Sequence, residues 1–265
     1  MIRSLWTAAT GMKAQQFNID TISNNLSNVN TTGYKSGRAE FKDLMYTELK
    51  RSNPNDDRNT PVNIQVGHGV RVSATSRDMT QGSAQATENP LDVAIDGDGF
   101  FEIQLPNGER RYTRDGSFKL SVNGAISDLV TSDGYYILDN NNNRIRLNSG
   151  VTDLDIDNKG NIRGSNQDGE NVEIATLKLV NFSNTKGLLN DGNNLYTESP
   201  ASGAAIVLNN FNMDSKILQG YLESSNVAVV EEMVKMISAQ RAYEVSSKSI
   251  QTSDEMMQQA NNLKR

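Results

Sequence analysis

The strongest constraint on the fold is a seven-residue repeat of apolar side chains at each end of the chain. Near the N-terminus the repeat is Leu5, Met12, Ile19 and Leu26, each followed three residues later by Ala8, Gln15, Ile22 and Val29. Near the C-terminus it is Val229, Met236, Tyr243, Ile250 and Met257, and the last four are followed at the same offset by Ala239, Ser246, Ser253 and Ala260. Because these two offsets share one side of a helix, the pattern predicts two terminal helices that pair as a coiled coil.

The expected limits of these helices come from their capping and stop signals. The first helix is predicted over about residues 3–30, with Gly33 as its C-terminal stop. The second is predicted over residues 227–265, which contain no Pro or Gly, with Ser225 or Asn226 as the N-cap. The first helix ends in a polar stretch, SNNLSNVNTTGYK from Ser23, whose Asn, Ser and Thr side chains compete with helical hydrogen bonds.

The middle of the chain alternates apolar and polar residues at the period of a β-strand. Apolar alternation occurs at Leu91, Val93 and Ile95 and again at Phe101, Ile103 and Leu105, and Asn-Gly or Asp-Gly turn signals follow at short intervals. We therefore predict an α+β fold: a helical domain of residues 1–33 and 225–265, an extended linker over 34–76 with a polar stretch at 53–59, and an antiparallel all-β domain over 77–224.

Composition excludes several classes of function. The net charge is −6 and there is no run of Lys or Arg, which argues against a nucleic-acid partner. The chain has no cysteine, so it forms no disulfide and has no thiolate nucleophile. No apolar run reaches the length of a membrane span, so we expect no membrane insertion. Thr7, Thr10 and Lys13 interrupt any apolar signal-peptide region, so we expect no cleaved signal.

No motif predicts a catalytic, metal or cofactor site. His68 is the only histidine and stands in a Gly-His-Gly turn without an orienting partner. The stretch GDGFFE from Gly97 lacks the third glycine of a dinucleotide-binding loop and reads as a hairpin turn. The segment from Asp153 to Gly164 departs from a calcium loop at several ligand positions, and Lys159-Gly160 is better interpreted as a turn. We therefore expect a protein that is not an enzyme and has no cofactor.

Several of these stretches resemble the flagellar rod and hook axial proteins, and within that family the distal-rod members. The resemblance rests on SNNLSNVNTTGYK, on LDVAIDGDGFFEIQ and RYTRDGSFKL in the middle, and on the C-terminal run that contains QRAYE. The family motif positions in this chain are Asn24, Asn25, Leu26, Asn28, Gly33, Tyr34 and Lys35, then Gln240, Arg241, Ala242, Tyr243 and Glu244.

The resemblance implies a structural subunit of the flagellar basal body that is exported without a cleaved signal and stacks helically into a hollow, torque-carrying rod. Its implied partners are copies of itself, proximal-rod and hook-side axial proteins, surrounding ring proteins and the export apparatus. The residues expected at the assembly interface are Leu5, Met12, Ile19, Ile22, Leu26, Val29, Val229, Met236, Tyr243, Ile250 and Met257. The polar residues of both helices would then keep the ends weakly helical until they dock.

Three other functions remain open at this stage. The first is a proximal-rod or hook-type subunit of the same family. The second is an extracellular glycan-binding β domain on a helical oligomerising stalk, with Tyr135 and Tyr136 stacking on sugars. The third is an enzyme, which ranks last because no convergent set of polar residues is evident.

Overall fold

The computed structural model describes residues 2–50, 64–124, 126–148, 154–165, 171–208 and 215–263. The predicted polar stretch at 53–59 lies outside them. The chain forms two compact units: a helical unit of Met1–Ser27, Gly37–Arg77 and Ala228–Arg265, and a β unit of Asn28–Ser36 and Asp78–Val227. This division differs from the expected one, because residues 28–33 join the β unit and most of the expected linker joins the helices.

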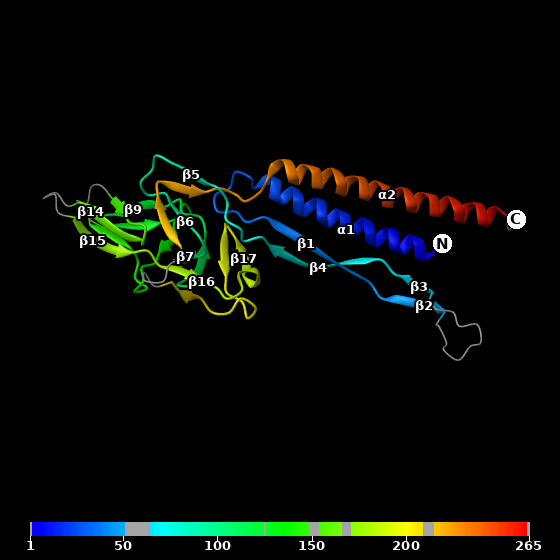
Figure 1. Cartoon of the computed structure of the whole chain (residues 1–265), viewed down its shortest axis with the longest axis horizontal. Helices are drawn as coiled ribbons and strands as arrows, with labels where there is room; N and C mark the ends of the chain where they lie inside the picture. Colours follow the sequence, from blue (N-terminus) through cyan, green and yellow to red (C-terminus); the bar gives the residue numbers. More distant parts are fainter. Residues whose placement is uncertain are drawn as a thin grey trace. The chain divides into compact units, whose positions relative to one another are not determined.

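The helical unit is built on two long helices, α1 (Ile2–Ser27) and α2 (Val229–Asn262), which lie side by side (Figure 1). They run antiparallel, since Ser4 contacts Ser253 at one end of the pair and Asn25 contacts Glu232 at the other. The two helices predicted from the heptad repeats are therefore present, and they pack on each other within one chain.

The ends of the helices differ from those predicted. α1 stops at Ser27, so Asn28 and Val29 lie in a turn and not in the helix. The N-cap of α2 is Ala228, and it makes no side-chain capping bond. Neither predicted cap was correct, because the Asn226 amide instead donates to the carbonyl of Asp78, and Ser225 Oγ accepts a bond from the Val227 amide.

Hydroxyl side chains are accommodated along both helices by bonds to the preceding turn. Thr21 Oγ1 donates to the carbonyl of Phe17 at 2.9 Å, and Ser246 Oγ donates to the carbonyl of Ala242 at 2.9 Å. Such bonds satisfy a polar side chain without breaking the helix, although they add little to its stability. This explains how α1 and α2 remain helical despite their many Ser and Thr residues.

The expected linker is instead a pair of antiparallel β-ribbons. Strand β1 (Gly37–Asp43) pairs with β4 (Val70–Arg77), and β2 (Tyr46–Lys50) pairs with β3 (Ile64–Gly67). Strands β1 and β4 also pack along α1 (Figure 1). The prediction of an extended segment was right for the backbone, but it missed the partner strands that satisfy the backbone hydrogen bonds.

The β unit is entirely antiparallel in the strands that the structure describes. Its main sheet comprises β7 (Phe100–Gln104), β8 (Arg110–Thr113), β9 (Lys119–Asn123), β10 (Ile126–Val130), β11 (Tyr136–Ile137), β12 (Arg146–Asn148), β16 (Leu179–Asn181), β17 (Leu189–Gly192), β18 (Leu195–Thr197) and β19 (Ile206–Val207). A three-stranded sheet consists of β13 (Leu154–Ile156), β14 (Asn161–Ser165) and β15 (Asn171–Thr176). Two further pairs join β5 (Ala84–Ala86) to β21 (Tyr221–Glu223) and β6 (Val93–Asp96) to β20 (Lys216–Gln219). A short 3-10 helix, η1, spans Thr185–Gly187.

The core of the β unit lies on both faces of β7, because successive side chains of a strand point to opposite faces. Phe101 and Ile103 enter a large aliphatic cluster, and both are fully buried. Phe100 enters an aromatic cluster in which its ring lies edge-on to Phe182 and Tyr196, with centroids 5.8 and 5.5 Å apart. The predicted antiparallel β domain is thus confirmed, with a core of its own.

Candidate assembly site

The facing sides of α1 and α2 carry small and polar residues at their closest contacts. Ser4 Oγ lies 3.3 Å from Ser253 Oγ, and a methyl group at Gly11 would lie 3.5 Å from Ser246 Oγ. Ala239 is buried on the same side of α2. Small side chains allow two backbones to come close together, and Ala239, Ser246 and Ser253 are the small residues at the +3 positions of the predicted repeat.

The predicted interface residues are buried only in part by this pairing. Ile22 is buried, and Val229 and Tyr243 are each 38% exposed. The partly buried residues are Leu5, Met12, Ile19, Leu26, Val29, Met236, Ile250 and Met257. Val29 also lies beyond the end of α1, in the β unit. Their contact with other subunits stays a prediction.

A second apolar stripe on α2 points away from α1, and the heptad analysis missed it. Its members are Val230, Met233, Val234 and Ile237, which are 76, 51, 59 and 50% exposed. Their offsets of three, four and seven place them on one side of the helix. We call these four residues the outer apolar face of α2. The helical spacing of these four residues is visible in the sequence. It has the same period as the predicted stripe, so the spacing alone did not show that α2 carries two separate stripes.

The last part of the N-terminal family motif is buried in the β unit, around Glu223. Lys35 Nζ contacts Glu223 Oε1 at 2.6 Å and donates to the Thr80 carbonyl at 2.8 Å. Arg114 Nη1 contacts Glu223 Oε2 at 3.3 Å, and all three charged side chains are almost completely buried. Burial lowers the pKa of Lys35, while the charge of Glu223 and its hydrogen bond oppose that shift. Three segments that are distant in the sequence thus share one buried charge cluster.

Gly33 is required at its position in the same motif. Its φ is +65°, and its amide donates to the Glu223 carbonyl at 2.8 Å. A β-carbon at Gly33 would lie 2.8 Å from the carbonyl carbon of Arg114. The motif residues from Gly33 to Lys35 therefore anchor the segment that follows α1 in the β unit, where Tyr34 is also buried.

The C-terminal family motif lies on the surface of α2. Gln240, Arg241 and Glu244 are exposed, and Ala242 is partly buried. In the N-terminal motif Asn24 is exposed, whereas Asn25 is buried between α1, β1 and α2. Of the two motifs, the N-terminal one therefore supplies most of the buried contacts.

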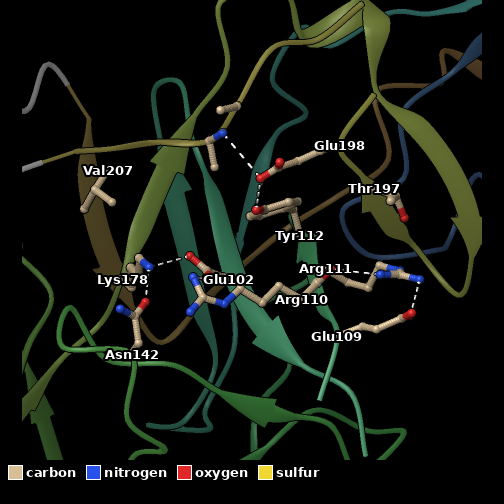
Figure 2. Close-up of a pocket in the computed structure, with 12 residues that line it drawn as sticks. Glu102, Glu109, Arg110, Arg111, Tyr112, Asn142, Lys178, Thr197, Glu198 and Val207 are labelled. Atoms are coloured by element: carbon tan, nitrogen blue, oxygen red, sulfur yellow. Dashed lines mark hydrogen bonds and ion pairs between the residues drawn. The ribbon is translucent and has the colours of Figure 1, made fainter. Parts of the chain in front are cut away.

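A polar hollow of about 720 Å³ lies on the β unit, on the same side of β7 as Phe100 (Figure 2). At its base, buried Lys178 Nζ lies 2.7 Å from Glu102 Oε2, and Arg110 Nη1 lies 3.1 Å from Glu102 Oε1. The Tyr112 hydroxyl donates to Glu198, and burial, followed by this contact, raises the pKa of Tyr112. Glu102, Arg110 and Lys178 are therefore paired by charge, whereas Glu198 accepts from the Tyr112 hydroxyl and from the Ala205 amide.

Other predicted chemistry finds little support in the geometry. Tyr135 packs against the core, and the Arg144 guanidinium covers the Tyr136 ring at 4.0 Å from its centroid, so neither ring is open for sugar stacking. The expectation that His68 lacks an orienting partner was wrong, because its Nε2 lies 2.5 Å from Thr47 Oγ1 on the neighbouring strand β2. Lys159-Gly160 does form the turn between β13 and β14, with φ of +82° at Gly160. Asp153 lies outside the described residues.

The described part of the chain has neither a cluster of metal-binding side chains nor a helix suited to a membrane. No group of three His, Cys, Asp or Glu side chains there is arranged to hold a metal ion. Within the same residues, neither helix is both long and apolar enough to cross a membrane.

Three family profiles match the chain, and all describe flagellar rod and hook proteins. They are the flagella basal body rod protein at residues 5–35, the flagellar hook protein FlgE/F/G D1 domain at 94–164, and the flagellar basal body rod FlgEFG protein C-terminal region at 218–263. They cover α1 with the motif that follows it, much of the β unit, and α2. The class is therefore that of the axial proteins of the flagellum.

Relatives of the full length narrow this class. The flagellar basal-body rod protein FlgG of Borreliella burgdorferi is 47% identical over 276 residues and covers 100% of both chains. The protein of the same name from Buchnera aphidicola is 46% identical, over 99% of this chain and 100% of its own, and that from Bacillus subtilis is 36% identical over 100% of both. The chain belongs to the flagellar basal-body rod protein family.

Proposed function

We propose that this chain is a structural subunit of the distal rod of the bacterial flagellar basal body. It polymerises with copies of itself into the hollow shaft that carries motor torque to the hook, and motility requires it. Full-length similarity to rod proteins at up to 47% identity supports this function. The structure also supports this function, because the buried charges of Lys35, Glu223 and Lys178 are paired, and the exposed residues of the outer apolar face of α2 are apolar.

The observation that carries the proposal is the outer apolar face of α2. Four neighbouring side chains on a terminal helix expose at least half of their surface to water. A contiguous exposed apolar patch of this kind marks a protein–protein interface. In a helical polymer of identical chains, the occupant of this face is another copy of the chain, and the packed helices form a coiled coil between and within subunits.

If the chain is a subunit of the distal rod, its position there implies the other partners. Proximal-rod and hook-side axial proteins would contact the two ends of the polymer, and ring proteins would surround it. The predicted interface residues, among them Leu26 and Met236, would contribute where they remain partly exposed. Passage through the flagellar export apparatus without a cleaved signal belongs to the same proposal.

The test places charge on the outer apolar face in cells. A strain that lacks its own copy of the gene would express either the natural chain or the double variant Val234→Asp with Ile237→Asp. Both side chains are at least half exposed, so the isolated fold should be little affected, whereas burial of two carboxylates at an interface should block assembly. We expect loss of swimming in soft agar and basal bodies without a distal rod by electron microscopy.

The control is Gln251→Asp, which adds charge at an exposed position on the same side of α2 but outside the apolar face. This strain should swim normally. Substitution of Leu26 or Met236 is a less clean test, because both are partly buried between the helices. A strain that carries the double variant, swims and has a complete rod would refute the proposal.

A further inference from the structure

The two terminal helices meet in one constant register. Ser4 contacts Ser253, Gly11 lies opposite Ser246, and Asn25 contacts Glu232. Each step of seven residues, or a multiple of seven, along α1 is matched by an equal step back along α2. We call each such pair of facing residues a layer. The layers are separated by seven residues, or by a multiple of seven, over most of the helix pair.

Most of these layers discriminate poorly between registers. If α2 slid by one heptad, Gly11 would face Ser253, which is again a small residue against a small residue. The larger apolar residues repeat at the same interval, from Leu5 to Leu26 and from Met236 to Met257. Packing would therefore be similar after a slip, because a heptad shift returns equivalent positions to each other.

The layer of Asn25 and Glu232 is the exception. Asn25 is 3% exposed and Glu232 is 6% exposed. Asn25 Nδ2 donates to Glu232 Oε2 at 3.1 Å and to the Gly37 carbonyl at 2.9 Å, and Asn25 Oδ1 accepts from the Gly37 amide at 2.8 Å. On its other oxygen, Glu232 accepts from Lys235 Nζ at 2.6 Å.

A slip by one heptad would break this layer in either direction. In one direction Asn25 would face Ala239, which offers no side-chain acceptor, and in the other it would face Ser225, which precedes α2. Glu232 would lose the amide of Asn25 in both cases. A buried polar group without its partner is costly, and a single buried Asn is a known means of selecting helix register.

We infer that Asn25 is the register-determining residue of the helical unit. Its amide selects Glu232 on α2, and its bonds to Gly37 fix the start of β1 at the same level. The register itself stands on this geometry, and only its consequence rests on the proposed function. In the rod, one register gives every copy of the chain the same outer apolar face at the same height.

The absence of cysteine from the chain makes register directly measurable by disulfide trapping. The native register would be read with Ser4→Cys plus Ser253→Cys, whose oxygens now lie 3.3 Å apart. The shifted registers would be read with Gly11→Cys plus Ser253→Cys and with Ser4→Cys plus Ser246→Cys. Each pair would be oxidised in the purified full-length chain and in isolated basal bodies. Peptide mapping would identify the linked cysteines, and non-reducing gel electrophoresis would separate bonds within a chain, which leave a monomer, from bonds between chains, which give a dimer.

With Asn25 present, we expect the native pair to form the disulfide and the shifted pairs to form little. Asn25→Ala should raise the yield of a shifted pair about tenfold relative to the native pair, the effect expected from one lost buried hydrogen bond. Glu232→Gln keeps an acceptor for the Asn25 amide and should retain the native register. Gln16→Ala, which removes an amide side chain at an exposed position of α1, is the control and should change nothing.

Two results would overturn the inference. One is Asn25→Ala protein that traps only the native pair, which would place register selection elsewhere. The other is Asn25→Ala protein that traps no pair, which would mean that Asn25 holds the helices together without choosing their register. Swimming is scored separately, so a motile strain with a shifted register would leave the proposed rod function intact and refute only its link to register.

Discussion

The two units of this chain place their apolar and polar residues in opposite ways. In the β unit, large side chains such as Phe101 and Leu179 are fully buried, and buried charges are paired with each other. In the helical unit, polar pairs such as Ser4 with Ser253 and Asn25 with Glu232 join the helices, while Val230 and Val234 face solvent. The comparison shows that the β unit carries its own core, whereas the helices leave large apolar side chains exposed in the single chain.

The difference fits a subunit that must both keep its shape and join a polymer. Stability of a single unit comes mainly from apolar burial, and the β unit has that within one chain. The helix pair has exposed valines, and under the proposed function it would gain further stabilisation on assembly. We expect the helical unit to be the less stable of the two in dilute solution.

The largest expected effect comes from removing the buried carboxylate of the β unit. Glu223→Ala would leave Lys35 and Arg114 buried without a counter-charge, and should lower the free energy of unfolding of the β unit by about 3–5 kcal/mol. Glu232→Ala, the corresponding change in the helical unit, should cost only about 1–3 kcal/mol, because its cationic partner Lys235 is 59% exposed.

Urea unfolding would measure both variants. Near-ultraviolet circular dichroism would follow mainly the β unit, which contains most of the tyrosines, and far-ultraviolet circular dichroism would follow the helices. Glu109→Ala, which removes a more exposed ion pair, should change stability by less than about 1 kcal/mol. If Glu223→Ala and Glu232→Ala lowered the free energy of unfolding equally, the proposed difference between the two units would be wrong.

A smaller effect is expected at the glycine of the N-terminal motif. Gly33 and Gly124 have φ of +65° and +69°, but only Gly33 has backbone atoms of Arg114 and Asp115 within 3 Å of a would-be β-carbon. Gly124→Ala should cost about 1 kcal/mol from left-handed strain alone. Gly33→Ala should cost about 2–4 kcal/mol, because backbone must also move. Thermal denaturation of both variants would check this, and similar melting temperatures would contradict a close fit at Gly33.

The smallest effect is a pH dependence within the β unit. The pKa of Tyr112 is raised, first by burial and then by its contact with Glu198. The neutral phenol is therefore favoured in the folded state, and its contribution to stability is complete below about pH 10, the unfolded pKa. Above that pH the unfolded chain loses its proton first, so stability falls by up to about 1.4 kcal/mol per pH unit.

Tyr112→Phe isolates this contribution. The variant is expected to be less stable than the natural chain at pH 8, because it lacks the bond to Glu198. Between pH 9 and 11 the difference between their urea midpoints should narrow, as the natural chain alone loses the contribution of Tyr112. A difference that stays constant across this range would show that Tyr112 titrates normally.

Local patterns in the sequence predicted the elements of the fold more successfully than their partners. The heptad repeats identified α1 and α2, and glycine-containing turns identified the β unit, including the turn at Gly160. The ribbons of β1 with β4 and of β2 with β3 were taken for a linker, because a strand pair is recognisable only when the partner strand is known. The predicted caps of α2 failed for a similar reason, since Asn226 has partners elsewhere.

The sequence by itself determined the helical period of both ends, the β character of the middle and the absence of a catalytic motif, since each depends on residues close together in the chain. Tertiary structure alone showed that a second apolar stripe of α2, which has the same period as the predicted stripe, remains exposed to solvent. It also brought Lys35, Arg114 and Glu223 into one buried cluster, and Asn25 against Glu232. Such contacts join distant segments, and their energies depend on burial and distance that local spacing does not encode.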